Sequence, residues 1–147
     1  MKKMLPPTLW EICLVLMFFL RLAFPIRFVF AYPYNLLGFL PILAGVALNI
    51  MADSQFKREK TNVKTYNEPD RLVTIGLFRY CRNPMYLGFT LLLVGGWILS
   101  GAASPLLGVL IFALAADRWY IPFEEKRLLN KFGQSYIDYR KKTPRWI

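Results

Sequence analysis

The sequence predicts an all-α integral membrane protein with about four transmembrane helices, and three observations support this fold class. Hydrophobic residues make up 56% of the 147 residues and charged residues only 19%, whereas an average soluble domain has about 45–50% apolar residues. Residues 85–116 are 32 consecutive positions without a charge. The charged residues gather instead in 53–83 and 117–147. We therefore expect a single membrane domain over 1–147 with its polar chemistry outside the lipid.

The first two apolar segments are expected to be membrane helices, at about 8–26 and 34–52. The first carries Arg21, whose long side chain can reach the lipid–water interface while its stem stays in lipid. The second carries no charge, and Gly38 and Gly45 would let a neighbouring helix approach its backbone closely. Both segments are long enough to cross the hydrocarbon core of a membrane.

The uncharged segment 85–116 is expected to fold into a tight helical hairpin. A single helix over it would be about 48 Å long at about 1.5 Å per residue, whereas the hydrocarbon core is about 30 Å thick. Small residues and a proline cluster at 100–105, which indicates a turn. We therefore expect the third and fourth spans at about 84–100 and 104–122.

Two basic segments predict the orientation of the chain. Seven lysines and arginines lie in 53–83, and eight more lie in 117–147. Because cytoplasmic segments of membrane proteins are rich in these residues, we expect the loop 53–83, the tail 123–147 and both termini in the cytoplasm. Apolar residues recur at helical spacing over about 124–141, which predicts an amphipathic helix in the tail.

Charge and composition also argue against two classes of partner. The net charge of +10 is explained by topology and by attraction to anionic lipid headgroups, and the split basic segments carry no nucleic-acid motif. The chain has no histidine and only two cysteines, Cys13 and Cys81. A zinc site or a Cys–His nucleophile pair is therefore not expected, and we expect neither a metal nor a nucleic acid as partner.

A polar motif and an acidic pair are expected to meet at the cytoplasmic end of the hairpin. Arg82 and Asn83 directly precede Pro84, which suits the first position of a helix, and Glu124 and Glu125 follow the fourth span. Such a meeting could hold a small zwitterion, with its carboxylate at the arginine and its ammonium or sulfonium at a glutamate. The simpler reading stays open: acidic residues suit a helix start, and arginines mark a membrane interface.

Two stretches of the sequence resemble a known family. RLVTIGLFRYCRNPMYLG (71–88) and EEKRLLNKFGQSYIDYRKKTPRWI (124–147) are similar to the isoprenylcysteine carboxyl methyltransferases and their relatives, the phospholipid N-methyltransferases. The matching pieces occur in the family's order across residues 71–146. The resemblance covers about half of the chain. It implies a membrane enzyme that uses S-adenosyl-L-methionine to methylate a carboxylate, amine or thiol of a lipid-like or small hydrophobic acceptor.

The same resemblance implies which residues form the site. The residues implied for the adenosine side of the cofactor are Leu72, Val73, Thr74 and Phe78. Those implied for its methionine side are Asn83, Pro84, Met85 and Tyr86, with Glu124 at the amino group and Lys64 as a further candidate. The candidate catalytic residues are Arg82, Tyr86 and Glu125. The residues expected to close the pocket are Tyr136, Tyr139, Arg145 and Trp146.

The sequence departs from the family pattern at two positions. Asn83 stands where histidine is commoner, and because asparagine does not titrate near neutrality, no proton shuttle is expected there. Tyr120 stands where the carboxyl methyltransferases carry an arginine for the substrate carboxylate, and the nearest arginine is Arg118. Arg118 and Tyr120 are therefore candidate substrate residues, and the resemblance does not extend to prenylcysteine specificity.

Two other functions fit part of the sequence. A small four-helix exporter could use Glu11, in the first span, as its coupling residue. A membrane reductase of the sterol-reductase type shares a related architecture, although it is usually much longer. The long basic loop and the structured tail argue against the exporter, which lacks both.

Overall fold

The computed structural model describes residues 5–27, 29–59 and 71–147, and its regular elements in these ranges are all helical, as expected. The membrane-length elements and their continuations are α1 (Pro6–Ala23), α2 (Phe39–Arg58), α3 (Pro84–Ser100), α4 (Leu106–Ala115), η3 (Ala116–Tyr120) and α5 (Ile121–Phe132). The short elements are the 3₁₀ turns η1 (Tyr34–Gly38) and η2 (Gly76–Arg79) and the final helix α6 (Gln134–Lys142).

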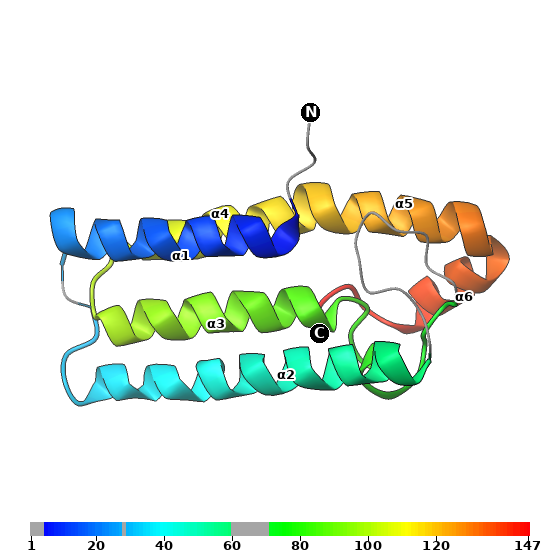
Figure 1. Cartoon of the computed structure of the whole chain (residues 1–147), viewed down its shortest axis with the longest axis horizontal. Coiled ribbons are helices and arrows are strands. Elements are labelled where there is room, and N and C mark those ends of the chain that lie inside the picture. Colours follow the sequence, from blue (N-terminus) through cyan, green and yellow to red (C-terminus); the bar gives the residue numbers. More distant parts are fainter. Residues whose placement is uncertain (1–4, 28, 60–70) are drawn as a thin grey trace.

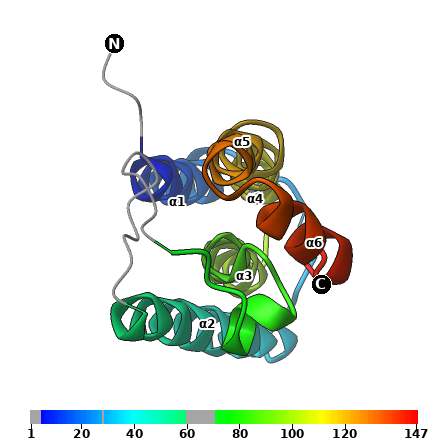
Figure 2. The ribbon, with the colours of Figure 1, turned by 90° about the vertical axis from the view of Figure 1, so that its right-hand side faces the viewer.

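The long helices run side by side along the molecule (Figure 1). Seen end-on, α3 lies at the centre, with α1, α2 and α4 around it and α6 to one side (Figure 2). The core residues between α1, α3 and the α4–α5 run are Cys13, Met17, Tyr86, Leu93, Val109, Phe112, Ala116 and Ile121. This core holds the starts of α1 and α3 at the same end of the bundle, which we call the motif end because it carries residues 71–83.

Two pairs of glycines bring the run of η1 and α2 into direct backbone contact with α3. A Cβ atom added at Gly38 would lie 2.5 Å from the Gly95 carbonyl oxygen, and one added at Gly45 would lie 2.6 Å from that of Gly88. Real Cβ atoms do not come so close, so only glycine fits at these positions. The close approach expected from Gly38 and Gly45 is therefore present, and it fixes α3 against α2.

The opposite end of the bundle, which we call the far end, is formed by two connections, one described at 24–27 and 29–34 and the other at 100–105. Backbone hydrogen bonds join these two connections, from Val29 N–H to Gly101 O (2.7 Å) and from Ala103 N–H to Ile26 O (2.9 Å). Gly101 ends α3 with a φ of 73°, a conformation that favours glycine. Arg21 in the last turn of α1 donates from Nε to the Ser100 carbonyl (2.8 Å).

Several helix boundaries differ from the expectation. The first span is Pro6–Ala23 rather than 8–26. The second span reaches Arg58, beyond the predicted end at residue 52. The fourth span and the tail helix, expected as 104–122 and 124–141, are one continuous helix from Leu106 to Phe132, followed by α6.

The proline at the expected start of the tail helix does not interrupt this run. Pro122 cannot donate a backbone hydrogen bond, and its ring would press on the carbonyl of Arg118 in a regular helix. A π turn over Ala116–Tyr120 ends two residues before it and widens the backbone at this point. The helix breaks instead at Gly133, whose φ is 51°, so the tail folds back eleven residues beyond Pro122.

The length and composition of the helices agree with a membrane location. Three runs are long and apolar enough to cross a membrane, Pro6–Ala23, Tyr34–Arg58 and Leu106–Phe132, and α3 is a shorter apolar helix. Large apolar side chains cover their outward faces, among them Phe18, Leu22, Leu40, Leu43 and Leu114. In water such a surface would be unfavourable, whereas in a bilayer it faces lipid.

Candidate functional site

The loop before α3 is fixed at the motif end by side chains of α2. Gln55 of α2 accepts a hydrogen bond from the Leu77 amide (3.2 Å) and donates one to the Ile75 carbonyl. Val73 and Phe78 are buried against Ala52. This small apolar cluster places the face of Phe78 next to the start of α3.

The first turn of α3 begins where the sequence predicts, at Pro84. Asn83 precedes it with φ −130° and ψ 56°, because the residue before a proline avoids the helical region. Its backbone carbonyl accepts the first helical hydrogen bond, from Leu87 (3.1 Å). Its side-chain amide donates to the Arg145 carbonyl (3.1 Å), so the motif is tied to the end of the chain.

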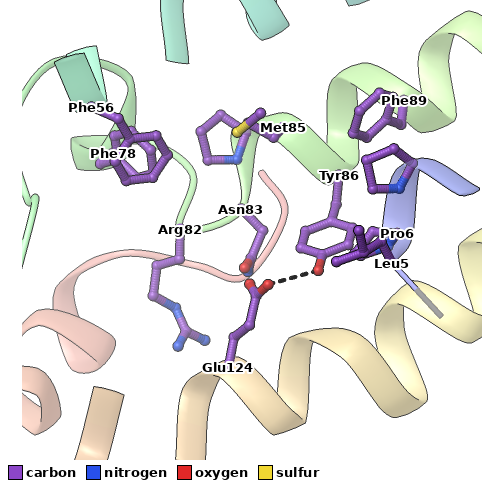
Figure 3. A pocket seen from close by; sticks show the side chains of 12 residues that line it. Leu5, Pro6, Phe56, Phe78, Arg82, Asn83, Met85, Tyr86, Phe89 and Glu124 are labelled. Carbon is purple, nitrogen blue, oxygen red and sulfur yellow. Dashed lines mark hydrogen bonds between the residues drawn. The ribbon is translucent and has the colours of Figure 1, made fainter. Parts of the chain in front are cut away.

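Tyr86 links α3 to α5. Its hydroxyl donates a 2.9 Å hydrogen bond to Oε1 of Glu124, the dashed line in Figure 3. The Tyr86 ring is 6% exposed and stacks near Tyr120, with ring centroids 6.4 Å apart. The meeting of the hairpin's start with the acidic pair, expected from topology, is therefore present in the structure.

The second glutamate of the pair belongs to a buried ionic network. Glu125 accepts from Arg82 through Oε1 (2.9 Å) and from Arg145 through Oε2 (2.9 Å). The Arg82 and Glu125 side chains are only 9% and 11% exposed. Arg82 also donates to the Tyr136 hydroxyl (2.9 Å). Since burying an unpaired charge is costly, these partners offset the cost of burying the Arg82 guanidinium.

The last residues of the chain extend this network to Asp117 in the π turn η3. Arg145 and Trp146 both donate to Oδ1 of Asp117, at 3.0 and 3.1 Å. The hydrogen bonds that Arg145 donates to Glu125 raise the pKa of the Arg145 guanidinium. The guanidinium of Arg145 therefore joins the π turn to the start of α5.

Backbone contacts complete the attachment of the tail to the motif. Tyr139 donates to the Phe78 carbonyl (2.6 Å), Thr143 donates to the Arg79 carbonyl (3.2 Å), and the Arg82 amide donates to the Pro144 carbonyl (3.0 Å). Burial raises the pKa of Tyr139, and burial with the charge of Glu125 raises that of Tyr136. Burial also raises the pKa of the Cys81 thiol, which makes it a poor nucleophile.

A cavity of about 390 Å³ opens beside the Tyr86–Glu124 hydrogen bond. Its walls are mostly apolar, and its polar groups are gathered on one side (Figure 3). The lining residues are Leu5, Pro6, Pro7, Phe56, Phe78, Arg82, Asn83, Pro84, Met85, Tyr86, Phe89 and Glu124. The cavity can therefore receive a ligand that has both an apolar part and charged groups.

Most of the residues named from the sequence for the methionine side and the motif lie on this cavity. These lining residues are Phe78, Arg82, Asn83, Pro84, Met85, Tyr86 and Glu124. Six other candidates are described but are not among the lining residues: Leu72, Val73, Thr74, Arg118, Tyr120 and Glu125. Lys64 falls outside the described residues.

The candidates away from the cavity wall have identifiable places. Val73 packs against Phe78, Thr74 is exposed, and the Tyr120 ring stacks on the ring of the cavity residue Tyr86. The Arg118 side chain is 77% exposed and lies 3.7 Å from Asp117. The four residues expected to close the pocket are not among its lining residues. Tyr136, Tyr139 and Arg145 are hydrogen-bonded to Arg82, Phe78 and Asn83, and Trp146 is hydrogen-bonded to Asp117.

Five cavity residues were not named from the sequence: Leu5, Pro6, Pro7, Phe56 and Phe89. The expected topology contains a signal for the first three, because four spans with cytoplasmic termini put the start of the first helix beside Pro84. Phe89 follows Met85 by one helical turn. Phe56 had no sequence signal, since it was assigned to the loop 53–83.

Comparison with known proteins places this geometry in a family. A family model described as phospholipid methyltransferase matches residues 34–135. The chain belongs to the phospholipid methyltransferase family. The match covers α2, α3, the α4–α5 run and the start of α6, which are the elements that carry most of the cavity. With the apolar helices, membership places the chain among integral membrane proteins.

Several curated members of the wider group are similar to this chain. Protein-S-isoprenylcysteine O-methyltransferase of Schizosaccharomyces pombe is 32% identical over 129 residues, which are 85% of this chain and 53% of the relative. The enzymes of that name from Rattus norvegicus and Xenopus laevis are each 30% identical, over 73% and 75% of this chain and 38% and 39% of their own lengths. The chain thus spans about half of these relatives or less. No solved structure matches it.

Proposed function

We propose that this chain transfers a methyl group from S-adenosyl-L-methionine to a lipid-like acceptor at the membrane. The observation that supports this most is the Tyr86–Glu124 hydrogen bond of 2.9 Å at the edge of a cavity of about 390 Å³. Cavities for small molecules measure about 300–1,000 Å³ and combine apolar walls with a few fixed polar groups. Family membership gives the reaction class.

The residue types in the cavity suit the cofactor. Phe56 and Phe78, whose rings lie 4.8 Å apart between centroids, form an aromatic wall that suits a purine base. Glu124 offers a carboxylate to an ammonium or sulfonium group, whereas Arg82 and Asn83 offer N–H donors to a carboxylate. Opposite charges in one cavity are what a zwitterionic amino-acid moiety requires.

S-adenosyl-L-methionine supplies a methyl group that is activated on a sulfonium sulfur. The residues of the chain then contribute mainly orientation and the exclusion of water. Tyr86 holds the Glu124 carboxylate in place, and its own hydroxyl and Arg82 line the cavity, where they can orient the acceptor. Glu125 acts as a positioning residue, because it reaches the cavity through Arg82.

The acceptor is proposed to be hydrophobic, because Leu5, Pro6 and Phe89 make the α1 side of the cavity apolar. The names of the relatives point to an acceptor carboxylate on a lipid-modified cysteine, and an amine or a thiol are the other candidates. Tyr120, through Tyr86, and Arg118, from the exposed face, are the proposed substrate residues. The basic residues around the motif end favour a cytoplasmic position for the cavity.

The exporter alternative has less support. Glu11, its proposed coupling residue, lies on the exposed face of α1, whereas a coupling carboxylate is expected to face the interior of the bundle.

Equilibrium binding of labelled S-adenosyl-L-methionine to the purified, detergent-solubilised protein tests the proposal. We expect saturable binding that weakens about tenfold or more in Glu124→Gln, because hydrogen bonds and ion pairs to a charged group contribute about 1.5–3 kcal/mol. Glu11→Gln is the matched control, since it makes the same change at an exposed carboxylate, and it should bind like the unaltered protein. Absence of saturable binding to the unaltered, folded protein would falsify the cofactor assignment.

A further inference from the structure

A second cavity, of about 410 Å³, lies along the seam of α1 and α3 toward the far end. It is almost entirely apolar, apart from an arginine and a serine. Its lining residues are Leu14, Val15, Met17, Phe18, Arg21, Gly96, Ser100 and Pro105. We call it the far groove. None of its lining residues belongs to the cavity at the motif end.

Trp10 separates the far groove from the motif-end cavity. Its indole N–H donates to the Phe89 carbonyl (3.2 Å), and the two rings lie 5.8 Å apart between centroids. Along α1, Trp10 lies between Pro7, which lines the first cavity, and Leu14, which lines the second. A ligand in the far groove therefore does not compete with a ligand at Tyr86 and Glu124.

The position of Arg21 gives the far groove a cation at one edge. Arg21 lies in the last turn of α1, and its Nε–H donates to the Ser100 carbonyl at the end of α3. Residues 12–52 and 83–116 contain two arginines, Arg21 and Arg27, and no aspartate or glutamate. The far end thus has a net positive charge at the depth where phospholipid headgroups lie.

The floor of the far groove has room for an acyl chain. A Cβ atom added at Gly96 would meet only Met17 Cε, at 3.9 Å, whereas one added at the adjacent Gly95 would clash with backbone at 2.5 Å. Val15 and Phe18 are 54% and 63% exposed, so the groove faces the lipid. From Arg21 to Leu14 the helix rises about 10 Å, most of the roughly 15 Å depth of one leaflet's hydrocarbon.

We propose that the far groove binds an anionic phospholipid of the leaflet opposite the candidate active site. The phosphate pairs with the guanidinium of Arg21, which offers several N–H donors in one plane. One acyl chain runs along Phe18, Val15 and Leu14 over the open floor at Gly96. The simpler role for Arg21, an interfacial side chain near a helix C-terminus, predicts neither a preferred headgroup nor sensitivity to filling the groove.

Native mass spectrometry of protein extracted from vesicles of equal parts phosphatidylglycerol and phosphatidylcholine tests the inference. We expect the unaltered protein to retain phosphatidylglycerol preferentially, and Arg21→Gln to retain roughly fivefold less of it. Arg27→Gln is the matched control, because it removes an equal charge at the same end from a residue outside the groove, and its retention should be unchanged. Arg21→Lys keeps the charge and should retain most of the lipid.

Filling the groove gives a second, independent readout. Gly96→Leu places a side chain on the open floor and should lower phosphatidylglycerol retention at least as much as Arg21→Gln, while S-adenosyl-L-methionine binding at the other cavity stays unchanged. Equal retention in Arg21→Gln and Arg27→Gln, or full retention in Gly96→Leu, overturns the inference. Equal retention of both lipids by the unaltered protein also overturns it. These outcomes are separate from failure of the methyltransferase proposal, which concerns the other cavity.

Discussion

Tyr86 Oη lies 2.9 Å from Glu124 Oε1, so the first turn of α3 is hydrogen-bonded to α5 across 38 positions of sequence. This bond forms one edge of the motif-end cavity and depends on the hairpin that brings both helices to the same end. The two side chains should therefore act together rather than independently.

A double-mutant cycle measures this coupling. We expect Tyr86→Phe and Glu124→Ala each to weaken S-adenosyl-L-methionine binding, and the double variant to be little worse than Glu124→Ala alone, because both changes remove the same hydrogen bond. A coupling energy of about 1 kcal/mol or more is expected for residues in direct contact. Tyr80→Phe, at a 71% exposed ring, is the control and should have no effect. Strictly additive losses would contradict the shared role.

The buried ion pairs should matter more to stability than the exposed one. Glu125→Gln removes the carboxylate that Arg82 and Arg145 share, and of the two only Arg145 keeps another carboxylate contact given above, to Asp117. Removal of one member of a buried pair costs about 3–5 kcal/mol. Asp53→Asn breaks an exposed helical pair with Lys57 and should cost less than about 1 kcal/mol. Unfolding in detergent, followed by circular dichroism, compares the two variants. Similar losses would mean that the network contributes no more than a surface pair.

The thiol of Cys81 reports whether the tail is attached. Cys81 is 6% exposed, and its Sγ lies 3.6 Å from the Arg145 carbonyl. In a Cys13→Ala background, where Cys81 is the single thiol, we expect slow alkylation at neutral pH because burial raises the thiol pKa. Arg145→Ala should accelerate alkylation at least tenfold by releasing the tail. Equal rates in both proteins would show that Arg145 does not hold it.

Alkaline pH should also release the C-terminal tail, which carries Tyr136 and Tyr139. Burial raises the pKa of Tyr139 and, with the charge of Glu125, that of Tyr136. The folded protein therefore keeps these phenol protons at a pH where the unfolded chain loses them. This stability is fully present below about pH 10, the ordinary pKa of tyrosine, and is lost as pH rises above it. Melting temperatures measured from about pH 8 to pH 11 should fall less steeply in Tyr139→Phe than in the unaltered protein.

The α2–α3 contact requires glycine at particular positions only. Gly45→Ala places a Cβ 2.6 Å from the Gly88 carbonyl oxygen and should destabilise the protein by about 1–3 kcal/mol, the usual cost of overpacking. Gly96→Ala, with its nearest neighbour at 3.9 Å, is the matched control and should be nearly neutral. Thermal unfolding of both variants in one detergent checks this, and equal midpoints would argue against close packing of α2 and α3.

The sequence predicts much of the framework, because charge and hydropathy patterns report on position relative to a membrane. The hairpin at 84–122 follows from the length of an uncharged segment, and with it the meeting of Tyr86 with Glu124. The glycines of the second span likewise indicate the close approach of a neighbouring helix. These features depend on local composition and on the thickness of a bilayer.

Other features depend on tertiary contacts that no local pattern reveals. Pro122 looks like a helix start, yet a preceding π turn accommodates it and the helix continues to Gly133. The sequence predicts Arg145 on the wall of the pocket, whereas in the structure its side chain forms ion pairs with Glu125 and Asp117. Phe56 lies in a helix that extends six residues beyond its predicted end, so its place on the cavity could not be foreseen.

Transfer of labelled methyl groups from S-adenosyl-L-methionine into a total lipid extract tests the central claim most directly. The unaltered protein in detergent is incubated with the extract, and Glu124→Gln and Glu11→Gln are assayed beside it. We predict label in a lipid-soluble product with the unaltered protein and with Glu11→Gln, and at least a tenfold lower rate with Glu124→Gln. Equal rates in Glu124→Gln and the unaltered protein, or no labelled product from a folded protein that binds the cofactor, would contradict the account.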